Sequence, residues 1–213
     1  MRRTILPTLV PALALVVLAS AHDAQAGARR SRPLKTGQTT CWNASGTVIA
    51  CAGTDQDGDL RRGESRSYQD NADGTIRDKR TALTWEKLSN DGSIHDKDTT
   101  YTWANAFAKI DDLNTAAFAG FSDWRLPNES ELETLLDRGT AVPSIGAIFS
   151  TSCPNGCTVL TCSCTVGGES IYWSSTSYVL GPAQAWVVNF FDGTAYVAPK
   201  TNTHQVRAVR GGS

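Results

Sequence analysis

The six cysteines of this chain fall into two groups, and their spacing restricts how the backbone can fold. Cys41 and Cys51 enclose a segment with the pattern of a hairpin, whose turn lies near residues 43–46. The second group is Cys153-x3-Cys157-x4-Cys162-x-Cys164. A bridge between its last two members would close too small a ring. This leaves a nested pairing (Cys153–Cys164 and Cys157–Cys162) or a crossed pairing (Cys153–Cys162 and Cys157–Cys164). We favour the nested pairing, because it makes one stapled loop.

Residues 1–26 have the three parts of a secretory signal peptide. Arg2 and Arg3 supply the positive end, an apolar run follows at residues 5–19, and Ala24-Gln25-Ala26 is a small-x-small cleavage site. The run is short for a membrane-spanning helix, and no later stretch is long and apolar. We therefore expect an exported chain, periplasmic or extracellular, with no transmembrane segment after cleavage.

The expected compartment indicates how the cysteines are used. Small exported domains use cysteines mainly for disulfides, and a bridge that closes a loop of about ten residues contributes about 3 kcal/mol. Four clustered cysteines also match the ligand count of a structural zinc site. We predict that all six cysteines are oxidised, and the alternative is a zinc site at the second group.

The remaining chain is predicted to have three parts. Residues 27–40 lack apolar periodicity and are expected to form a flexible basic lead-in. Residues 41–69 hold the N-terminal hairpin and a polar turn, and residues 70–211 form the main domain. The formal net charge of the whole chain is −1, which gives no indication of a nucleic-acid or membrane partner. Nothing in the sequence indicates an oligomeric state.

Apolar residues repeat at helical spacing in two segments. The first predicted helix covers residues 101–118, and Thr99 or Thr100 is its expected N-cap. Its apolar stripe consists of Trp103, Phe107, Ile110 and Leu113. The second predicted helix follows Pro127, where Asn128 and Glu131 have the spacing of a capping box. It is expected to end near residues 138–139, where a glycine follows an arginine.

Other segments alternate at strand spacing. Residues 68–84 are predicted to form a hairpin, since Asp73-Gly74 is a strong turn signal. From residue 171 onward the period is two: residues 186, 188 and 190 are apolar on one face, and a turn follows at residues 192–193. A final strand is predicted over residues 205–210. Two helices and an antiparallel sheet predict an α+β fold.

Six blocks follow one another in a specific order along residues 70–211. They are Asp70-Asn71-Ala72-Asp73-Gly74-Thr75, Leu83-Thr84-Trp85, Asp123-Trp124-Arg125-Leu126-Pro127, Tyr172-Trp173-Ser174-Ser175-Thr176, Trp186-Val187-Val188-Asn189-Phe190 and Val206-Arg207-Ala208-Val209-Arg210. In this order the chain resembles the Lcl C-terminal domain family, which is named after a bacterial collagen-like adhesin. The resemblance implies a C-type-lectin-like fold whose Arg-Leu-Pro helix is similar to one in formylglycine-generating enzymes. It implies no established activity.

Four aromatic side chains are the candidate ligand-binding residues: Tyr172, Trp173, Tyr178 and Trp186. Trp173 and Trp186 would form a sugar-stacking platform if exposed, but aromatic residues at strand spacing usually pack in a core, and we favour that interpretation. Binding chemistry in such a fold belongs on loops. The excursion at residues 142–168 and the turn at residues 179–182 are therefore expected to form one adjoining surface. It is almost uncharged, which suits a neutral glycan or a protein surface.

Charged residues suggest two further sites. Asp55, Asp57 and Asp59 resemble the start of a calcium loop, but the glycine lies at the fourth position instead of the sixth. Calcium is thus the one cofactor considered, and a polar turn is the favoured interpretation. A sulfated glycan would need the basic residues of one of two groups. These are Arg29, Arg30, Arg32 and Lys35, or Lys200, Arg207 and Arg210.

The sequence therefore predicts an exported, non-catalytic binding module that recognises a glycan or a cell-envelope or extracellular surface. The alternative is a structural or assembly component of the cell envelope that docks to a protein partner. A more distant alternative is a relative of formylglycine-generating enzymes, in which Cys162 and Cys164 would mimic reactive cysteines. The clustering of four cysteines in one loop favours pairing between them instead.

Overall fold

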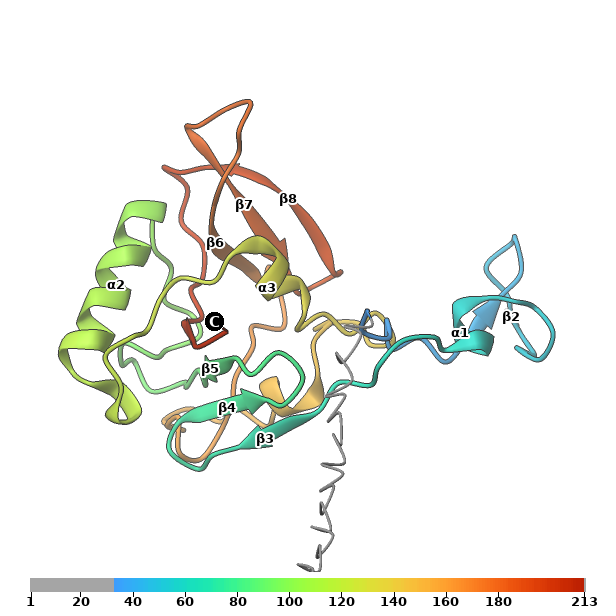
Figure 1. Ribbon diagram of the computed structural model, residues 1–213, viewed down its shortest axis with the longest axis horizontal. Helices are drawn as coiled ribbons and strands as arrows, with labels where there is room; N and C mark the ends of the chain where they lie inside the picture. Colours follow the sequence, from blue (N-terminus) through green and yellow to red (C-terminus); the bar gives the residue numbers. More distant parts are fainter. Residues whose placement is uncertain (1–32, 213) are drawn as a thin grey trace, which may run out of the picture. The chain divides into compact units, whose positions relative to one another are not determined.

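The computed structural model describes residues 33–212 of the protein (Figure 1). These residues belong to one compact unit. The predicted signal peptide and the arginines of the predicted lead-in lie outside the described residues. Within residues 33–212, no helix is long and apolar enough to cross a membrane.

The N-terminal hairpin forms as predicted. Strands β1 (Cys41–Trp42) and β2 (Val48–Ile49) pair antiparallel, and a disulfide joins Cys41 to Cys51. The Asn43 side chain shapes the turn, because its Oδ1 accepts hydrogen bonds from the backbone N–H groups of Ser45 and Thr47. A one-turn helix, α1 (Asp57–Leu60), follows.

Residues 33–40 differ from the flexible lead-in that the sequence predicted. The backbone N–H of Lys35 donates to the carbonyl of Glu64 at 2.9 Å, and that of Arg138 donates to the carbonyl of Thr36 at 2.7 Å. A Cβ at Gly37 would lie 3.2 Å from the backbone nitrogen of Gly139. This stretch contains little apolar sequence, so backbone hydrogen bonds and close backbone contact hold it.

Two antiparallel sheets build the main domain (Figure 1). The four-stranded sheet has the order β3 (Tyr68–Asp70), β4 (Thr75–Asp78), β5 (Thr84–Glu86) and β9 (Val209–Arg210). The three-stranded sheet has the order β6 (Ile171–Ser177), β7 (Gln184–Asn189) and β8 (Thr194–Pro199). The mixed α+β architecture with antiparallel sheets therefore agrees with the prediction.

The predicted final strand is shorter than expected. Only Val209 and Arg210 form β9, which pairs with β5, while Gln205 makes a parallel bridge to Tyr172 of β6. The last segment thus leaves one sheet and enters the other, and residues 206–208 pass between them through the core. This crossing explains why the alternation over residues 205–210 is not one continuous strand.

The helices follow the predicted starts more closely than the predicted ends. Helix α2 (Trp103–Thr115) has Thr102 as its N-cap, so the predicted N-cap of Thr99 or Thr100 is wrong, and a 3-10 turn, η1 (Phe118–Gly120), comes after the helix. Helix α3 (Glu129–Glu133) has the predicted capping box of Asn128 and Glu131 but ends early, at Thr134. A second 3-10 turn, η2 (Ala147–Phe149), lies in the long excursion.

The two faces of the sheet β6–β8 contact different core clusters. Tyr172, Val188 and Phe190 pack with the leucines around α3, while Trp173 and Val187 pack with α2. Helix α2 buries Ala106, Lys109, Ile110 and Leu113, so the buried face is rotated from the predicted stripe. The buried face includes Lys109, which the predicted stripe left out. Phe107 lies at the edge of that face and is 37% exposed.

That lysine belongs to a buried charged network around Glu86 on β5. Glu86 is fully buried, and its Oε1 lies 3.0 Å from Lys109 Nζ and 2.7 Å from His95 Nδ1. Its Oε2 accepts a hydrogen bond of 2.8 Å from the backbone N–H of Ala208. Burial by itself would raise the pKa of Glu86, but Lys109, His95 and the Ala208 N–H outweigh it and hold the pKa below its usual value.

Arg207 extends the network to the disulfide loop. Its guanidinium is fully buried, donates at 2.9 Å to the carbonyl of Glu86 and at 2.6 Å to the carbonyl of Cys164, and lies over the Phe149 ring. Lys109 also donates to the carbonyl of Val206 at 3.1 Å. Side chains of α2 and the C-terminal segment are thus tied to β5 by charge-assisted hydrogen bonds inside the core.

Replacing Lys109 by methionine should lower the free energy of unfolding by about 3–5 kcal/mol, because Glu86 loses its fully buried cationic partner. Chemical denaturation followed by circular dichroism measures this loss. The exposed pair Arg80–Glu64 provides the control, since Arg80→Met should cost about 1 kcal/mol or less. The double variant Glu86→Gln with Lys109→Met should cost less than the sum of its single changes. Equal losses for Lys109→Met and Arg80→Met would contradict this role.

Candidate functional site

Two of the four predicted ligand-binding aromatics lie in the core. Tyr172 and Trp173 are both 0% exposed, and the Trp173 indole N–H donates to the carbonyl of Tyr101 at 2.7 Å. The Tyr172 ring packs edge-on against Phe190 with centroids 5.2 Å apart. Neither ring can contact a surface ligand, so both residues are removed from the candidate site. For Trp173 this agrees with the favoured interpretation of core packing.

The other two aromatics lie together near the end of hairpin β6–β7. Tyr178 and Trp186 are half-buried, and their ring centroids are 6.0 Å apart in an edge-on contact. The backbone N–H of Tyr178 donates to the carbonyl of Gln184 at 3.0 Å, so the ring is attached to ordered backbone. These two rings remain the candidate site.

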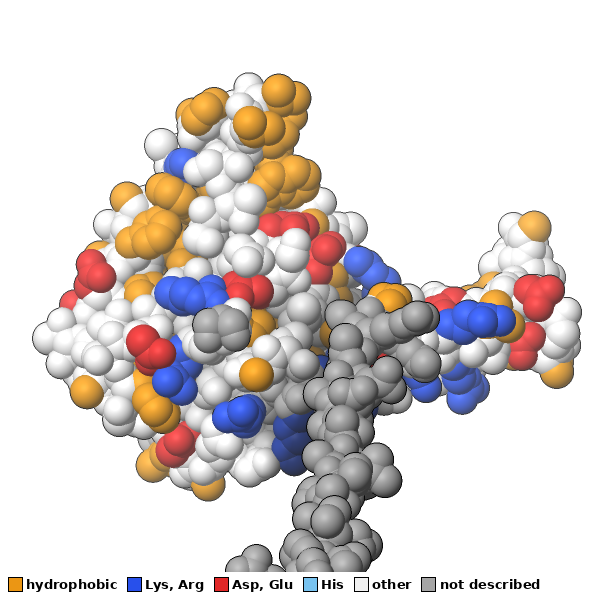
Figure 2. Space-filling view, viewed as in Figure 1, with side chains coloured by type: hydrophobic (Ala, Val, Ile, Leu, Met, Phe, Trp, Pro, Cys, Tyr) orange, Lys and Arg blue, Asp and Glu red, His pale blue; other side chains and the backbone are white. Residues whose placement is uncertain are grey.

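The end of this hairpin is aliphatic. Val179 and Leu180 are 84% and 82% exposed, and Figure 2 shows hydrophobic side chains gathered over this end of the molecule. No Asp, Glu, Lys or Arg occurs between residues 170 and 191. Surface recognition here would depend on apolar contact, ring faces, hydroxyls and backbone groups.

A neighbouring aromatic surface was missed by sequence reasoning. Trp103 at the start of α2 is half-buried, its ring contacts Phe107 edge-on at 4.6 Å, and the ammonium group of Lys200 lies 3.8 Å from its centroid. Lys200 also donates to Ser177 Oγ at 2.7 Å. This places Lys200 beside the candidate site. The predicted apolar stripe assigned Trp103 and Phe107 to the core. The burial of Ala106 and Lys109 shows that the buried face of α2 is rotated away from that stripe.

The cysteine-rich excursion lies elsewhere. Figure 1 shows it beside β3 and β4, at the end of the domain opposite to the tip of hairpin β6–β7. The backbone N–H of Cys164 donates to the carbonyl of Leu88, and that of Asn90 donates to the carbonyl of Cys157. The expectation that residues 142–168 and the turn at residues 179–182 form one surface is therefore wrong. The excursion packs instead against residues 88–90, which follow strand β5.

The four cysteines of the excursion form the nested disulfides Cys153–Cys164 and Cys157–Cys162. Their four sulfur atoms lie within 4.8 Å of one another. In the part of the chain that the structure describes, this is the one group of three or more His, Cys, Asp and Glu side chains with converging ligand atoms. Reduced thiolates here would have the ligand set of a zinc site, as the sequence alternative proposed.

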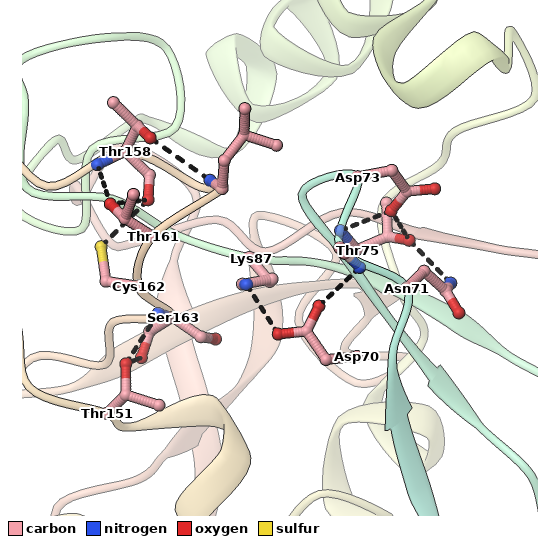
Figure 3. A network of polar contacts seen from close by, with 12 residues as sticks. Asp70, Asn71, Asp73, Thr75, Lys87, Thr151, Thr158, Thr161, Cys162 and Ser163 are labelled. Carbon is pink, nitrogen blue, oxygen red and sulfur yellow. Dashed lines mark hydrogen bonds and ion pairs between the residues drawn. The ribbon is translucent and has the colours of Figure 1, made fainter.

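Polar side chains next to this loop are paired among themselves (Figure 3). Lys87 Nζ lies 2.8 Å from Asp70 Oδ2, and Asp73 Oδ1 accepts hydrogen bonds from both the backbone N–H and the hydroxyl of Thr75. A Cβ at Gly74 would lie 2.9 Å from Val159, so the glycine lets this turn pack against the disulfide loop. These groups build the turn.

The three aspartates of the possible calcium loop do not converge among the described residues. Asp57 accepts a hydrogen bond from the Thr36 hydroxyl, while Asp59 Oδ2 accepts from the backbone N–H groups of Gly53 and Thr54 at 2.9 and 3.2 Å. Asp57 and Asp59 lie in α1, and Asp55 precedes it with a left-handed φ of 56°. The carboxylates of Asp57 and Asp59 thus make hydrogen bonds to residues near α1.

Of the second basic group considered for a sulfated glycan, one member does not reach the surface. Arg207 is fully buried, so the prediction that it could contact a ligand is wrong. Arg210 donates to Asp123 Oδ1 at 2.7 Å and stacks over Phe121 at 3.6 Å. Lys200 and Lys35 are the described members that remain without a carboxylate partner among the described residues.

All six cysteines should be oxidised in the mature protein, because the structure pairs each of them. Alkylation under denaturing conditions, with a chelator and without reductant, should add no mass to the intact chain. Peptide mapping should recover the two nested cross-links. Labelling of four thiols, or one zinc ion per chain before chelation, would establish the zinc alternative instead.

The two tryptophans of the predicted platform should respond differently to truncation. Trp173→Ala should cost about 3–5 kcal/mol, because it leaves a cavity beside α2. Trp186→Ala removes a half-buried ring and should cost only about 1 kcal/mol. Urea denaturation of both variants measures the difference, and comparable losses would show that Trp186 is a core residue.

Comparison with known proteins identifies the domain. A search of curated proteins found no match to the chain. The model of the Lcl C-terminal domain matches residues 74–210, a stretch that contains both sheets except β3 and both helices α2 and α3. This match covers more than half of the chain and agrees with the blocks seen in the sequence. The chain therefore belongs to the Lcl C-terminal domain family.

Proposed function

We propose that this protein is an exported, non-catalytic binding module of C-type-lectin-like fold that recognises a glycan at a cell-envelope or extracellular surface. The observation that carries the proposal is the uncharged end of hairpin β6–β7, where Tyr178 and Trp186 present half-buried ring surfaces. Three disulfides in the described chain support an oxidising compartment.

The topology supports a lectin-like fold. The C-terminal strand β9 returns to pair with β5, near the start of the domain, and two helices precede the three-stranded antiparallel sheet. The Arg125-Leu126-Pro127 segment leads into α3, and the backbone of Arg125 pairs with Val209 in both directions, at 2.8 and 3.0 Å. The helices and terminal strands thus form a scaffold, and the hairpin end is free to carry recognition.

The chemistry of the candidate site favours a neutral glycan. The apolar ring faces of Tyr and Trp can stack on the C–H faces of sugars. Ser177, the residue before Tyr178, adds a hydroxyl group. Lys200 supplies one positive charge, held between Ser177 and the Trp103 ring. A single lysine is a weak match for a sulfated polymer, which is bound by several basic groups together.

A non-catalytic role is supported by how the ionisable groups are used. Glu86 and Lys109, a fully buried acid–base pair, are enclosed in the core and bonded to the backbone of residues 206 and 208. His95 is bonded to Glu86, and His204 packs on the Trp173 ring, where burial lowers its pKa. Cys162 and Cys164 are in disulfides, which supports pairing over a reactive role.

A glycan array with neutral and sulfated glycans tests this proposal. Binding to neutral glycans should fall about tenfold or more in Tyr178→Ala and in Trp186→Ala, because each loses a stacking surface. Tyr196→Ala is the matched control, since Tyr196 is an exposed tyrosine on β8 of the same sheet, and it should bind normally.

A stoichiometric protein complex recovered from envelope material, with no retention on any glycan, would favour the alternative of a structural or assembly component. Turnover of a substrate by the purified protein, abolished by one substitution, would contradict the non-catalytic role.

A further inference from the structure

The end of hairpin β6–β7 is shaped by two consecutive turns that force aliphatic side chains outward. The backbone N–H of Gly181 donates to the carbonyl of Tyr178, and that of Gln184 donates to the carbonyl of Gly181. Val179 and Leu180 are the central residues of the first turn, and Pro182 takes the favoured second position of the next one. Their exposure of more than 80% follows from this hydrogen-bonded geometry.

Two adjacent aliphatic residues at a turn are unusual, because turns favour Gly, Pro, Asn, Asp and Ser. Among the large hydrophobic residues that the structure describes, Val179 and Leu180 are the most exposed. Scattered exposed leucines are normal on protein surfaces, but here two lie side by side on a projecting corner. Figure 2 shows this corner as part of a hydrophobic end.

We propose that Val179 and Leu180 insert into the interfacial region of a lipid bilayer and anchor the domain there. Two charged residues lie against the strands below the hairpin end: Lys200, whose ammonium group can meet an anionic lipid headgroup, and Glu129, whose backbone N–H donates to Thr176 Oγ1. Residues 170–191 carry no charged side chain, and Lys200, bonded to Ser177 at the base of the end, contributes a positive one. Tyr178 and Trp186 lie behind the aliphatic corner, and such amphipathic rings favour the headgroup level of a membrane.

A bilayer suits this corner better than a second copy of the chain. A stable protein interface buries about 800 Å² on each partner, which two side chains on a convex corner do not supply. A bilayer accepts a convex apolar projection without a matching groove, and inserted groups reach about 5–10 Å into the headgroup and acyl boundary. The inference goes beyond glycan recognition, because it depends on Val179 and Leu180 and not on the two rings.

Flotation with vesicles tests the anchor, using the purified full-length mature protein. The protein should float with vesicles of phosphatidylethanolamine and phosphatidylglycerol, and the double variant Val179→Ser with Leu180→Ser should bind at least about tenfold more weakly. The matched control is Val48→Ser with Leu160→Ser, which removes two other exposed aliphatic groups, 63% and 62% exposed, and should float normally. Lys200→Gln should weaken binding to these anionic vesicles about fivefold but leave binding to phosphatidylcholine unchanged.

Three outcomes would overturn the anchor: no flotation of the wild-type protein, equal flotation of the double variant, or a dimer in light scattering that the double variant abolishes. The last result would assign the corner to a second copy. The glycan array separates this inference from the proposed function, because the double variant keeps Tyr178 and Trp186. Glycan binding without flotation would contradict only the anchor, and flotation without glycan binding would contradict only the glycan proposal.

Discussion

The buried carboxylate of Glu86 is the interaction on which the rest of the domain depends. It joins β5 to α2 through Lys109, to the following loop through His95, and to the C-terminal segment through the Ala208 N–H. A buried charge is tolerated only when its partners replace the water that it loses. Each of these segments must therefore be in place before the carboxylate is satisfied, which couples distant parts of the chain.

Arg207 carries this coupling into the disulfide loop. Its guanidinium reaches the carbonyls of Glu86 and Cys164 from a segment that crosses between the two sheets. The loop with its nested disulfides is thereby attached to the core as well as stapled to itself. At the other end, strands β6 and β7 contribute side chains to a core cluster on each face of their sheet, so hairpin β6–β7 projects from a packed base (Figure 1). A rigid base is what allows two turns to hold aliphatic side chains in water.

Short-range patterns were the reliable part of the sequence. The Asn128–Glu131 capping box, the Asp73-Gly74 turn and the Cys41–Cys51 hairpin all form as predicted, because each depends on residues within a few positions of one another. The nested cysteine pairing also forms, since short loops leave few ways to connect four neighbouring cysteines. These features depend only on residues close together in the sequence, so their spacing is enough to predict them.

Sequence patterns gave wrong predictions of burial where burial depends on contacts with distant segments. A lysine outside the apolar stripe of a helix is expected to be exposed, yet Lys109 is buried because Glu86, distant in sequence, neutralises it. Arg207 lies in a polar-looking terminal strand, yet it crosses the core because the last segment changes sheets. The sequence by itself determined the start of α3, the tight turns, the two groups of cysteines and the family. Only the tertiary structure decided which aromatic rings are exposed and which charges are buried, because burial depends on contacts between segments that no local spacing records.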